Sequence, residues 1–200
     1  MCRLVETIRI ENGKAVNLEY HNRRMASAIY DLFRLKKQID LREIIMVPAG
    51  LEDKIVKCRI IYRENIEKVE YQPYSFRKIM RLRVIGDDII DYRYKYSDRS
   101  AIDKLFSMRG DCDDILIVKN GFVTDTSYAN IIFRKSGGQW ITPATCLLKG
   151  TRRESLLDAG LISEESVTVD DIQYYKEARL INAMMGIDDT DVIPVANIIL

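Results

Sequence analysis

The sequence predicts a mixed α+β fold in two lobes. Short segments in which apolar and polar residues alternate indicate β-strands, and one long segment with apolar residues three and four positions apart indicates an α-helix. A glycine followed by two aspartates at Gly86 indicates a boundary in the segment 86–92. We therefore expect a small N-terminal α+β lobe over residues 1–86 and a larger α/β lobe over residues 87–200.

The first lobe is expected to begin with a β-hairpin. Residues 5–10 and 14–17 flank the pair Asn12-Gly13, which accepts the positive φ of a two-residue turn. Residues 18–35 then predict a helix whose apolar stripe consists of Met25, Ile29, Leu32 and Phe33. The remaining expected elements of this lobe are a short helix over 40–47 and strands over 57–63, 69–71 and 79–84.

The second lobe is expected to mix short strands with short helices. The expected strands cover residues 114–118, 129–134, 167–169, 179–183 and 191–194. The expected helices cover residues 100–108, 152–159 and 171–176. Thr151 and Glu154 have the spacing of a capping box at the start of the second of these helices, and Gly160 predicts its end.

Composition excludes several classes of function. The 200 residues include 31 basic and 30 acidic side chains, so the net charge does not indicate a nucleic-acid or membrane partner. The chain has no apolar run of membrane-spanning length, and its start lacks a signal-peptide pattern. Four scattered cysteines have no metal-ligand spacing. We expect a cytoplasmic protein with reduced thiols and no metal site.

A series of motifs between residues 91 and 159 indicates a cofactor site. Lys95 lies in the run 91–100, Asp125 lies in the run 123–133, and a glycine at position 150 precedes the helix expected at 152–159. Pyridoxal phosphate acts as an electron sink that a protein holds through a lysine, a carboxylate beside the pyridinium nitrogen and an anion site for the phosphate. A helix start is such an anion site. The sequence supplies all three groups in that order.

The order of these motifs resembles the class IV aminotransferase family, the pyridoxal-phosphate enzymes of fold type IV. The likeness runs from Glu6-Thr-Ile-Arg9 to Asn182-Ala183. It implies Lys95 as the catalytic lysine and pyridoxal 5′-phosphate as the cofactor. The motif His-x-x-Arg, here His21-Asn-Arg-Arg24, implies a phosphate arginine at position 24 rather than 23. The cofactor-binding positions implied by the resemblance are Arg24, Asp125, Gly150, Thr151, Arg152, Asn182, Ala183 and Met184.

Structural interpretations of these residues stay open. Asp125 replaces the glutamate that the family usually has and could be a turn residue, and Thr151 could simply cap a helix. Asn182 could pair its amide with backbone groups at a strand end. For His21 we favour a structural or cofactor-adjacent hydrogen bond over a general base, because the catalytic lysine can itself move protons.

The lysine segment Lys95-Tyr-Ser-Asp-Arg99 looks most like that of aminodeoxychorismate lyases, which have Asn-Arg where this chain has Asp-Arg. That resemblance implies a lyase that converts 4-amino-4-deoxychorismate into 4-aminobenzoate and pyruvate for folate biosynthesis. The alternatives are a branched-chain or D-amino-acid aminotransferase and a cofactor binder without turnover. The candidate substrate-binding residues are Thr7, Arg59, Tyr62 and Arg99.

The chain also departs from the family pattern. Most relatives have an extra strand before the segment that begins at Val5, and a longer first lobe between Arg63 and Arg81. We therefore expect a shortened N-terminal lobe. The resemblance implies a homodimer with the active site near the subunit interface.

Overall fold

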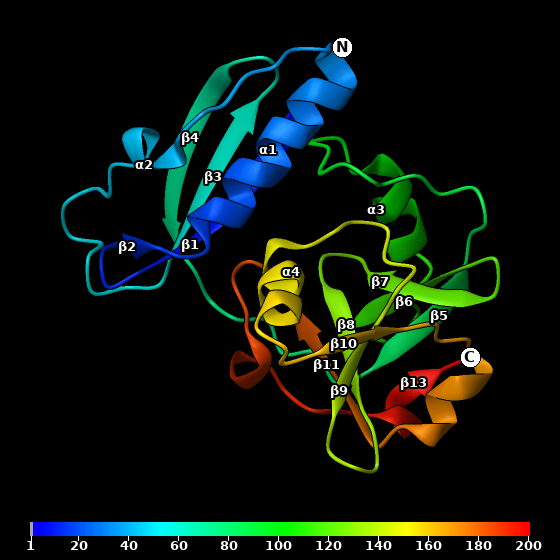
Figure 1. The fold of residues 1–200 in the computed structure, drawn as a ribbon. Helices are drawn as coiled ribbons and strands as arrows, with labels where there is room; N and C mark the ends of the chain where they lie inside the picture. The colour runs from blue at the N-terminus through cyan, green and yellow to red at the C-terminus, as the bar shows by residue number, and fades with distance from the viewer. Residues whose placement is uncertain (1) are drawn as a thin grey trace. The chain divides into compact units, whose positions relative to one another are not determined.

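The computed structural model describes residues 2–200, which form two compact units (Figure 1). The first unit runs to Ser75 and includes Tyr94–Asp98, and the second comprises Phe76–Arg93 and Arg99–Leu200. This division differs from the boundary expected at 86–92 in two ways. The segment from Phe76 to Arg93 belongs to the second unit, and the short stretch around Lys95 belongs to the first.

Within residues 2–200, the first unit is built on a four-stranded antiparallel sheet with the order β2-β1-β3-β4. These strands are β1 (Leu4–Glu11), β2 (Lys14–Ala15), β3 (Val56–Tyr62) and β4 (Ile66–Pro73). The hairpin between β1 and β2 turns at Asn12 and Gly13, whose φ angles are 49° and 70°. Two positive φ angles match the tight turn that the Asn-Gly pair predicts.

Helix α1 (Leu18–Phe33) covers one face of this sheet (Figure 1). Its buried residues are His21, Met25, Ala28 and Ile29, which are spaced three and four apart and so share one face. They pack in a core with alternate residues of β1 and β3, including Ile8, Val56 and Ile60. Each fully buried aliphatic side chain contributes about 1.5–3 kcal/mol. The expected helix over 40–47 is the short α2 (Leu41–Ile44), which Asp40 caps by accepting the Arg42 backbone N–H at 3.0 Å.

The segment that carries Lys95 belongs to the first unit because its backbone pairs with the start of β1. Val5 N–H donates to the Lys95 carbonyl at 2.9 Å, and Ser97 N–H donates to the Arg3 carbonyl at 2.8 Å. Tyr94 and Tyr96 pack against the core of this unit. The expectation that the C-terminal lobe carries this lysine is therefore corrected: its backbone is part of the N-terminal sheet region.

The second unit contains a nine-stranded mixed sheet, counting residues 2–200 only. Seven strands follow the order β10-β9-β8-β7-β6-β5-β13, while β11 pairs with β8 and β12. The strands are β5 (Leu82–Gly86), β6 (Asp114–Lys119), β7 (Phe122–Thr126), β8 (Asn130–Arg134), β9 (Trp140–Pro143), β10 (Ser163–Glu165), β11 (Glu177–Ile181), β12 (Ile193–Pro194) and β13 (Ile198–Ile199). The helices are α3 (Ser100–Phe106) and α4 (Thr151–Asp158), with 3₁₀ turns η1 (Asp170–Tyr174), η2 (Ile187–Asp189) and η3 (Val195–Asn197).

The centre of this sheet has buried strands joined by short turns. Strands β6 and β7 form a hairpin at Asn120 and Gly121, again with two positive φ angles, 50° and 81°. Strand β7 then pairs with β8 through the register partners Asp125 and Asn130. These two polar residues therefore lie opposite each other at the end of a hairpin.

Two sequence predictions about this unit are wrong. Residues 167–169 do not form a named strand: Asp171 accepts the backbone N–H and the hydroxyl of Thr168 at 2.8 and 2.6 Å, which bends the chain into η1. The strand expected from Ile79 begins only at Leu82. Before it, the N–H groups of Met80 and Arg81 donate to the Asp113 carboxylate instead of a sheet partner.

Across residues 2–200, no helix has both the length and the continuous apolar character needed to cross a membrane. The same residues contain no group of three or more metal-ligating side chains placed to hold a metal ion.

Candidate active site

A buried carboxylate organises the polar residues of the first unit. Glu6 lies on β1 in a row with Leu4, Ile8 and Ile10, and all four are fully buried. The Arg24 guanidinium donates to both of its oxygens, from Nε to Oε1 at 3.0 Å and from Nη2 to Oε2 at 2.6 Å. The Nδ1 atom of His21 lies 2.6 Å from Oε2. Strand and helix therefore meet through one Glu-His-Arg cluster in an otherwise apolar core.

Electrostatics keep this cluster in one charge state. Burial alone would raise the pKa of Glu6, but the Arg24 charge and the hydrogen bond with His21 outweigh it and lower that pKa to about 2. Burial lowers the pKa of His21, and the charges of Arg24 and Lys95 act in the same direction. At neutral pH the cluster holds an ionised glutamate, a guanidinium and a neutral imidazole. The imidazole proton lies on Nδ1, because an ionised carboxylate accepts but cannot donate.

The spacing of His21 and Arg24 has the consequence that the sequence predicts. Residues three apart share a helix face, and both contact the same carboxylate. Arg23 instead is exposed, and its guanidinium lies 4.4 Å from the centre of the Tyr20 ring. The two adjacent arginines therefore differ in environment, because Arg24 is half-buried and paired with Glu6 whereas Arg23 is exposed.

The candidate substrate residues of the first unit lie on two different faces of the sheet. Thr7 and Arg59 are register partners on the face away from α1, and Arg59 Nη1 donates to Glu70 at 3.0 Å. Tyr62 is three residues from Arg59 on the same strand, so it points to the opposite face, where it is buried. Burial and the nearby Glu6 charge raise the pKa of Tyr62. Tyr62 therefore does not join Thr7 and Arg59 in one surface.

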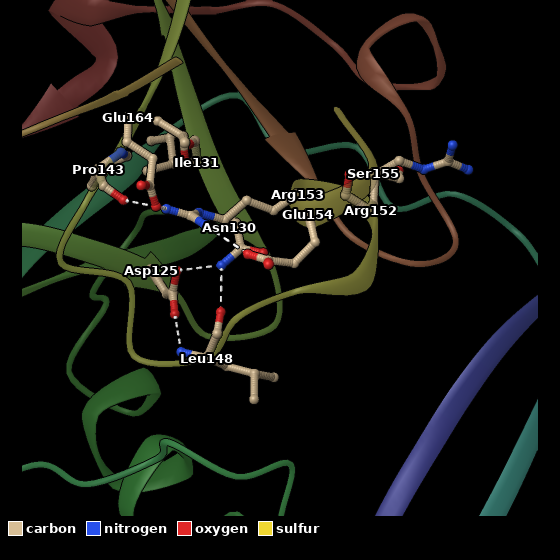
Figure 2. Close-up of polar contacts among 11 residues, drawn as sticks. Asp125, Asn130, Ile131, Pro143, Leu148, Arg152, Arg153, Glu154, Ser155 and Glu164 are labelled. Carbon is tan, nitrogen blue, oxygen red and sulfur yellow. Dashed lines mark hydrogen bonds and ion pairs between the residues drawn. The ribbon is translucent and has the colours of Figure 1, made fainter. Parts of the chain in front are cut away.

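In the second unit, Asp125 is held by groups on two sides. Figure 2 shows its Oδ1 accepting the Asn130 side-chain amide at 2.7 Å and its Oδ2 accepting the Leu148 N–H at 3.0 Å. Burial raises the pKa of Asp125 to about 6, although both donors and the Arg153 charge act to lower it. The carboxylate is therefore buried, oriented and easily influenced by a neighbouring charge.

Helix α4 begins directly after this carboxylate site. Its N-cap residue is Gly150, and the first intrahelical bond runs from Glu154 N–H to the Gly150 carbonyl at 2.9 Å. The capping box expected from Thr151 and Glu154 is wrong, because Thr151 is already the first helical residue and the Gly150 N-cap has no side chain to form the box. A helix start presents backbone N–H groups and the positive end of the helix dipole, so it favours anions.

The far end of α4 follows the prediction from Gly160. That residue has a φ of 65°. Its N–H donates to Leu157 at 2.9 Å, and Leu161 N–H donates to Leu156 at 2.9 Å, the two bonds of a Schellman ending.

Arg153 is a residue of α4 that the sequence patterns did not indicate, and it is fully buried. Its Nη1 donates to Glu154 at 3.0 Å, and its Nη2 donates to the Pro143 carbonyl at 3.1 Å and to the Glu164 carboxylate. It therefore ties α4 to the ends of β9 and β10. The Arg152 side chain extends away from Asp125 (Figure 2). Only the backbone of Arg152 therefore contributes to the anion-binding start of α4.

The remaining candidates lie in turns of the second unit. Asn182 pairs by backbone bonds in both directions with Met185, at 3.1 and 2.9 Å, and its Oδ1 accepts the Met184 N–H at 2.8 Å. Ala183 lies within this tight turn. The sequence left open whether the Asn182 amide pairs with backbone groups, and in the structure it does. Arg99 precedes α3, and its Nη2 donates to the Ser127 carbonyl at 2.8 Å.

An open pocket of about 360 Å³ in the first unit is lined by α1 and residues 38–42. No predicted site residue lines it, and its lining contains paired surface charges such as Arg42 with Asp40. The buried polar clusters around Glu6 and Asp125 are therefore better candidates for the active site than this pocket.

A comparison with protein families shows the family of this chain. A family model described as amino-transferase class IV matches residues 96–198, more than half of the chain. The chain belongs to the class IV aminotransferase family. It is an enzyme, and its mixed α+β fold is the fold of this family.

Relatives of similar length support the family assignment. An uncharacterized protein of Haemophilus influenzae is 44% identical over 191 residues, which cover 94% of this chain and all of that protein. A structure described as a "putative 4-amino-4-deoxychorismate lyase" from Haemophilus somnus is 36% identical, covers 94% of this chain and 98% of its own, and superposes with a TM-score of 0.88.

More distant class IV structures share the fold. A hypothetical aminotransferase from Mycobacterium tuberculosis in its PLP-bound form is 16% identical with a TM-score of 0.77, over 98% of this chain and 81% of that one.

A shorter sequence match is also found. A Schizosaccharomyces pombe protein named "putative aminodeoxychorismate lyase" is 44% identical over 55 residues, 26% of this chain and 23% of that protein.

Three buried polar residues of this family member were missed by sequence reasoning: Glu6, Asn130 and Arg153. For Glu6 a signal existed, since it interrupts the apolar row of Leu4, Ile8 and Ile10 on a strand. A charge on the buried face of a strand needs a partner. Asn130 and Arg153 gave no comparable signal, because their partners include main-chain carbonyls that only the folded chain brings near.

Proposed function

We propose that this protein is a pyridoxal-phosphate-dependent 4-amino-4-deoxychorismate lyase that releases 4-aminobenzoate and pyruvate. The observation that carries the proposal is the similarity to the Haemophilus somnus protein described as such a lyase, which extends over nearly the whole of both chains. The lysine segment supports the same choice, because Lys95 is followed by Asp98-Arg99 where lyases have Asn-Arg.

The residues present fit the cofactor by their chemistry. Asp125 is a buried carboxylate, the type of group that pairs with a pyridinium nitrogen. Gly150 is the N-cap of α4, and the backbone N–H groups of the first helical turn are the type of group that binds a phosphate. Arg24 offers a guanidinium whose plane Glu6 fixes. When bound, pyridoxal phosphate supplies the electron sink that stabilises charge on a substrate carbon.

The chain's own groups would then perform binding and proton transfer. Lys95 Nζ would hold the cofactor, and its free amine would take a proton from the substrate and later return one. His21 is buried and bonds to Glu6 through Nδ1, so we assign it a structural role and leave proton transfer to Lys95. Pyruvate leaves as the ring becomes aromatic.

Arg24→Ala is expected to weaken cofactor binding far more than Arg23→Ala. Removing a guanidinium that pairs with a phosphate in a partly desolvated site costs about 2–5 kcal/mol. Arg23 is exposed and contacts Tyr20, so its removal leaves the phosphate contacts intact. Titration of each apoprotein with pyridoxal phosphate measures the difference. Equal losses of cofactor affinity in the two variants would contradict the assignment of Arg24 as the arginine that binds the phosphate.

Asp125→Asn is expected to keep the fold and lower turnover sharply. The amide has nearly the same shape, but it can accept only one of the two hydrogen bonds from Asn130 and Leu148 and has no charge with which to stabilise a protonated pyridine nitrogen. Asp125→Glu is expected to retain activity or raise it, because it restores the family's usual residue. Steady-state kinetics of the two variants, with urea unfolding as a control for folding, check this. Unchanged turnover in the Asn variant would give the role to another group.

The lyase and the aminotransferase differ in their need for an amino acceptor. Holoenzyme incubated with 4-amino-4-deoxychorismate alone is expected to form 4-aminobenzoate over many turnovers, because elimination returns the cofactor to its starting form. An aminotransferase would stop after one half-reaction until a keto acid is added. Stalling with common amino acids and no product from aminodeoxychorismate would replace our proposal with the aminotransferase. A protein that binds the cofactor and turns over neither substrate class would be a non-catalytic binder.

The family name and the aminotransferases among its structural neighbours favour the aminotransferase as the second candidate. The role in folate biosynthesis, the homodimer and the cytoplasmic location stay predictions.

A further inference from the structure

One amide side chain joins the carboxylate of β7 to the loop that begins α4. Asn130 Nδ2 donates to Asp125 Oδ1 at 2.7 Å and to the Leu148 carbonyl at 2.9 Å. The N–H of the same Leu148 donates to Asp125 Oδ2 at 3.0 Å. The backbone of residue 148 is therefore held through its donor by Asp125 and through its acceptor by Asn130 (Figure 2).

The oxygen of the same amide lies against the N-cap glycine of α4. A Cβ added to Gly150 would lie 2.0 Å from Asn130 Oδ1 and 3.2 Å from its Cγ. The backbone of Gly150 has φ −71° and ψ 138°, a conformation open to any residue. Glycine is therefore required here by the approach of Asn130 and not by the dihedral angles.

We propose that Asn130 is a positioning residue that fixes the distance between the Asp125 carboxylate and the N-terminus of α4. Asn130 is 5% exposed, and its amide contacts both the Asp125 carboxylate and Gly150. Buried polar groups with all their partners in place hold a unique geometry, because each lost bond is costly.

The consequence for the enzyme rests on the proposed function. The pyridine nitrogen and the phosphate are two ends of one rigid molecule, so a protein that binds both ends needs its carboxylate and its anion site at one fixed separation. Small displacements of positioned groups have large effects on binding and rate. Asn130 would supply that separation without touching the substrate.

A double-mutant cycle on the apoprotein tests the contact itself. Gly150→Ala is expected to lower the urea midpoint of unfolding in the parent chain, and to lower it much less when Asn130→Ala has removed the opposing amide. Gly137→Ala, at a glycine with open space around it, and Asn197→Ala, whose amide binds the Met80 carbonyl, are the matched controls. Equal effects of Gly150→Ala in both backgrounds would show that no such contact exists. Asn130→Ser replaces Asn130→Ala if the latter does not fold.

Cofactor titrations then test the positioning role. Asn130→Ala is expected to raise the dissociation constant of pyridoxal phosphate about tenfold or more, while Asn197→Ala changes it less than about twofold. Loss of the amide donor also moves the acid limb of the turnover profile to higher pH, because that donor helps keep Asp125 ionised while Arg153 and Cys146 stay in place beside it. Unchanged affinity and an unchanged profile would overturn the role of Asn130. Failure of the parent protein to bind the cofactor would instead overturn the proposed function, and the double-mutant cycle on the apoprotein would still decide whether Asn130 contacts Gly150.

Discussion

Lys95→Ala is expected to lower turnover by at least about 10³-fold while the protein still binds pyridoxal phosphate. The substitution removes both the covalent hold on the cofactor and the group that transfers the proton, each of which contributes orders of magnitude to the rate. The backbone of residue 95 keeps its bond from Val5 N–H, so the fold should persist. Product assays on the variant, with the exposed Lys104→Ala as a control, measure the effect. Turnover at the parent rate would remove Lys95 from the mechanism.

Glu6→Gln is expected to lower the free energy of unfolding by about 3–5 kcal/mol, the cost of removing one partner of a buried ion pair. The substitution leaves the Arg24 charge and the His21 ring without their buried anion. Glu19→Gln, at an exposed position in the first turn of α1, is the matched control and should change little. Urea unfolding at neutral pH measures both. Equal stability of the two variants would contradict the organising role of Glu6.

The acid dependence of stability gives an independent check on the same residue. The pKa of Glu6 is about 2 in the fold, below its usual 4.5, so its contribution of about 3 kcal/mol is present above pH 4.5 and lost as the pH falls toward 2. The lowered pKa of His21 acts in the same direction, whereas the raised pKa of Asp125 favours the fold below pH 3.8 and ceases to do so as the pH rises through about 6. Glu6→Gln should therefore show a flatter loss of stability in acid than the parent chain.

Local sequence signals predicted those parts of the fold that local forces determine. The Asn-Gly pair of the β1–β2 hairpin specifies its turn because its two residues tolerate positive φ. The apolar stripe around Met25 and Ile29 specifies the buried face of α1. Gly160 specifies the end of α4. In each case the relevant residues are within a few positions of one another.

The parts that sequence did not predict depend on a side-chain contact that overrides a local pattern or on residues far apart in the chain. Residues 167–169 alternate like a strand, but the Asp171 carboxylate binds Thr168 and starts a turn. The Lys95 segment pairs with Arg3 and Val5, ninety or so positions earlier, and no local pattern reports such pairing. The contacts within the candidate active site also join residues that are distant in the sequence.

Residue types and order suggest the members of the candidate site, and the fold adds how those residues are arranged. Arg24 was chosen over Arg23 by motif, and the structure adds that Glu6 orients it. Asp125 was chosen by motif, and the structure adds the amide of Asn130 that holds it. The residues that position the others are buried polar side chains, which a single sequence does not distinguish from ordinary polar residues.

The central claim, that Lys95 carries pyridoxal phosphate, is tested most directly by trapping the cofactor on the protein. Holoprotein reduced with borohydride and digested should yield one pyridoxyl-labelled peptide, with the label on Lys95. Arg24→Ala should yield less of the same peptide at limiting cofactor, since its affinity is lower. A label on any other lysine, or no label on a protein that has bound the cofactor, would contradict the account.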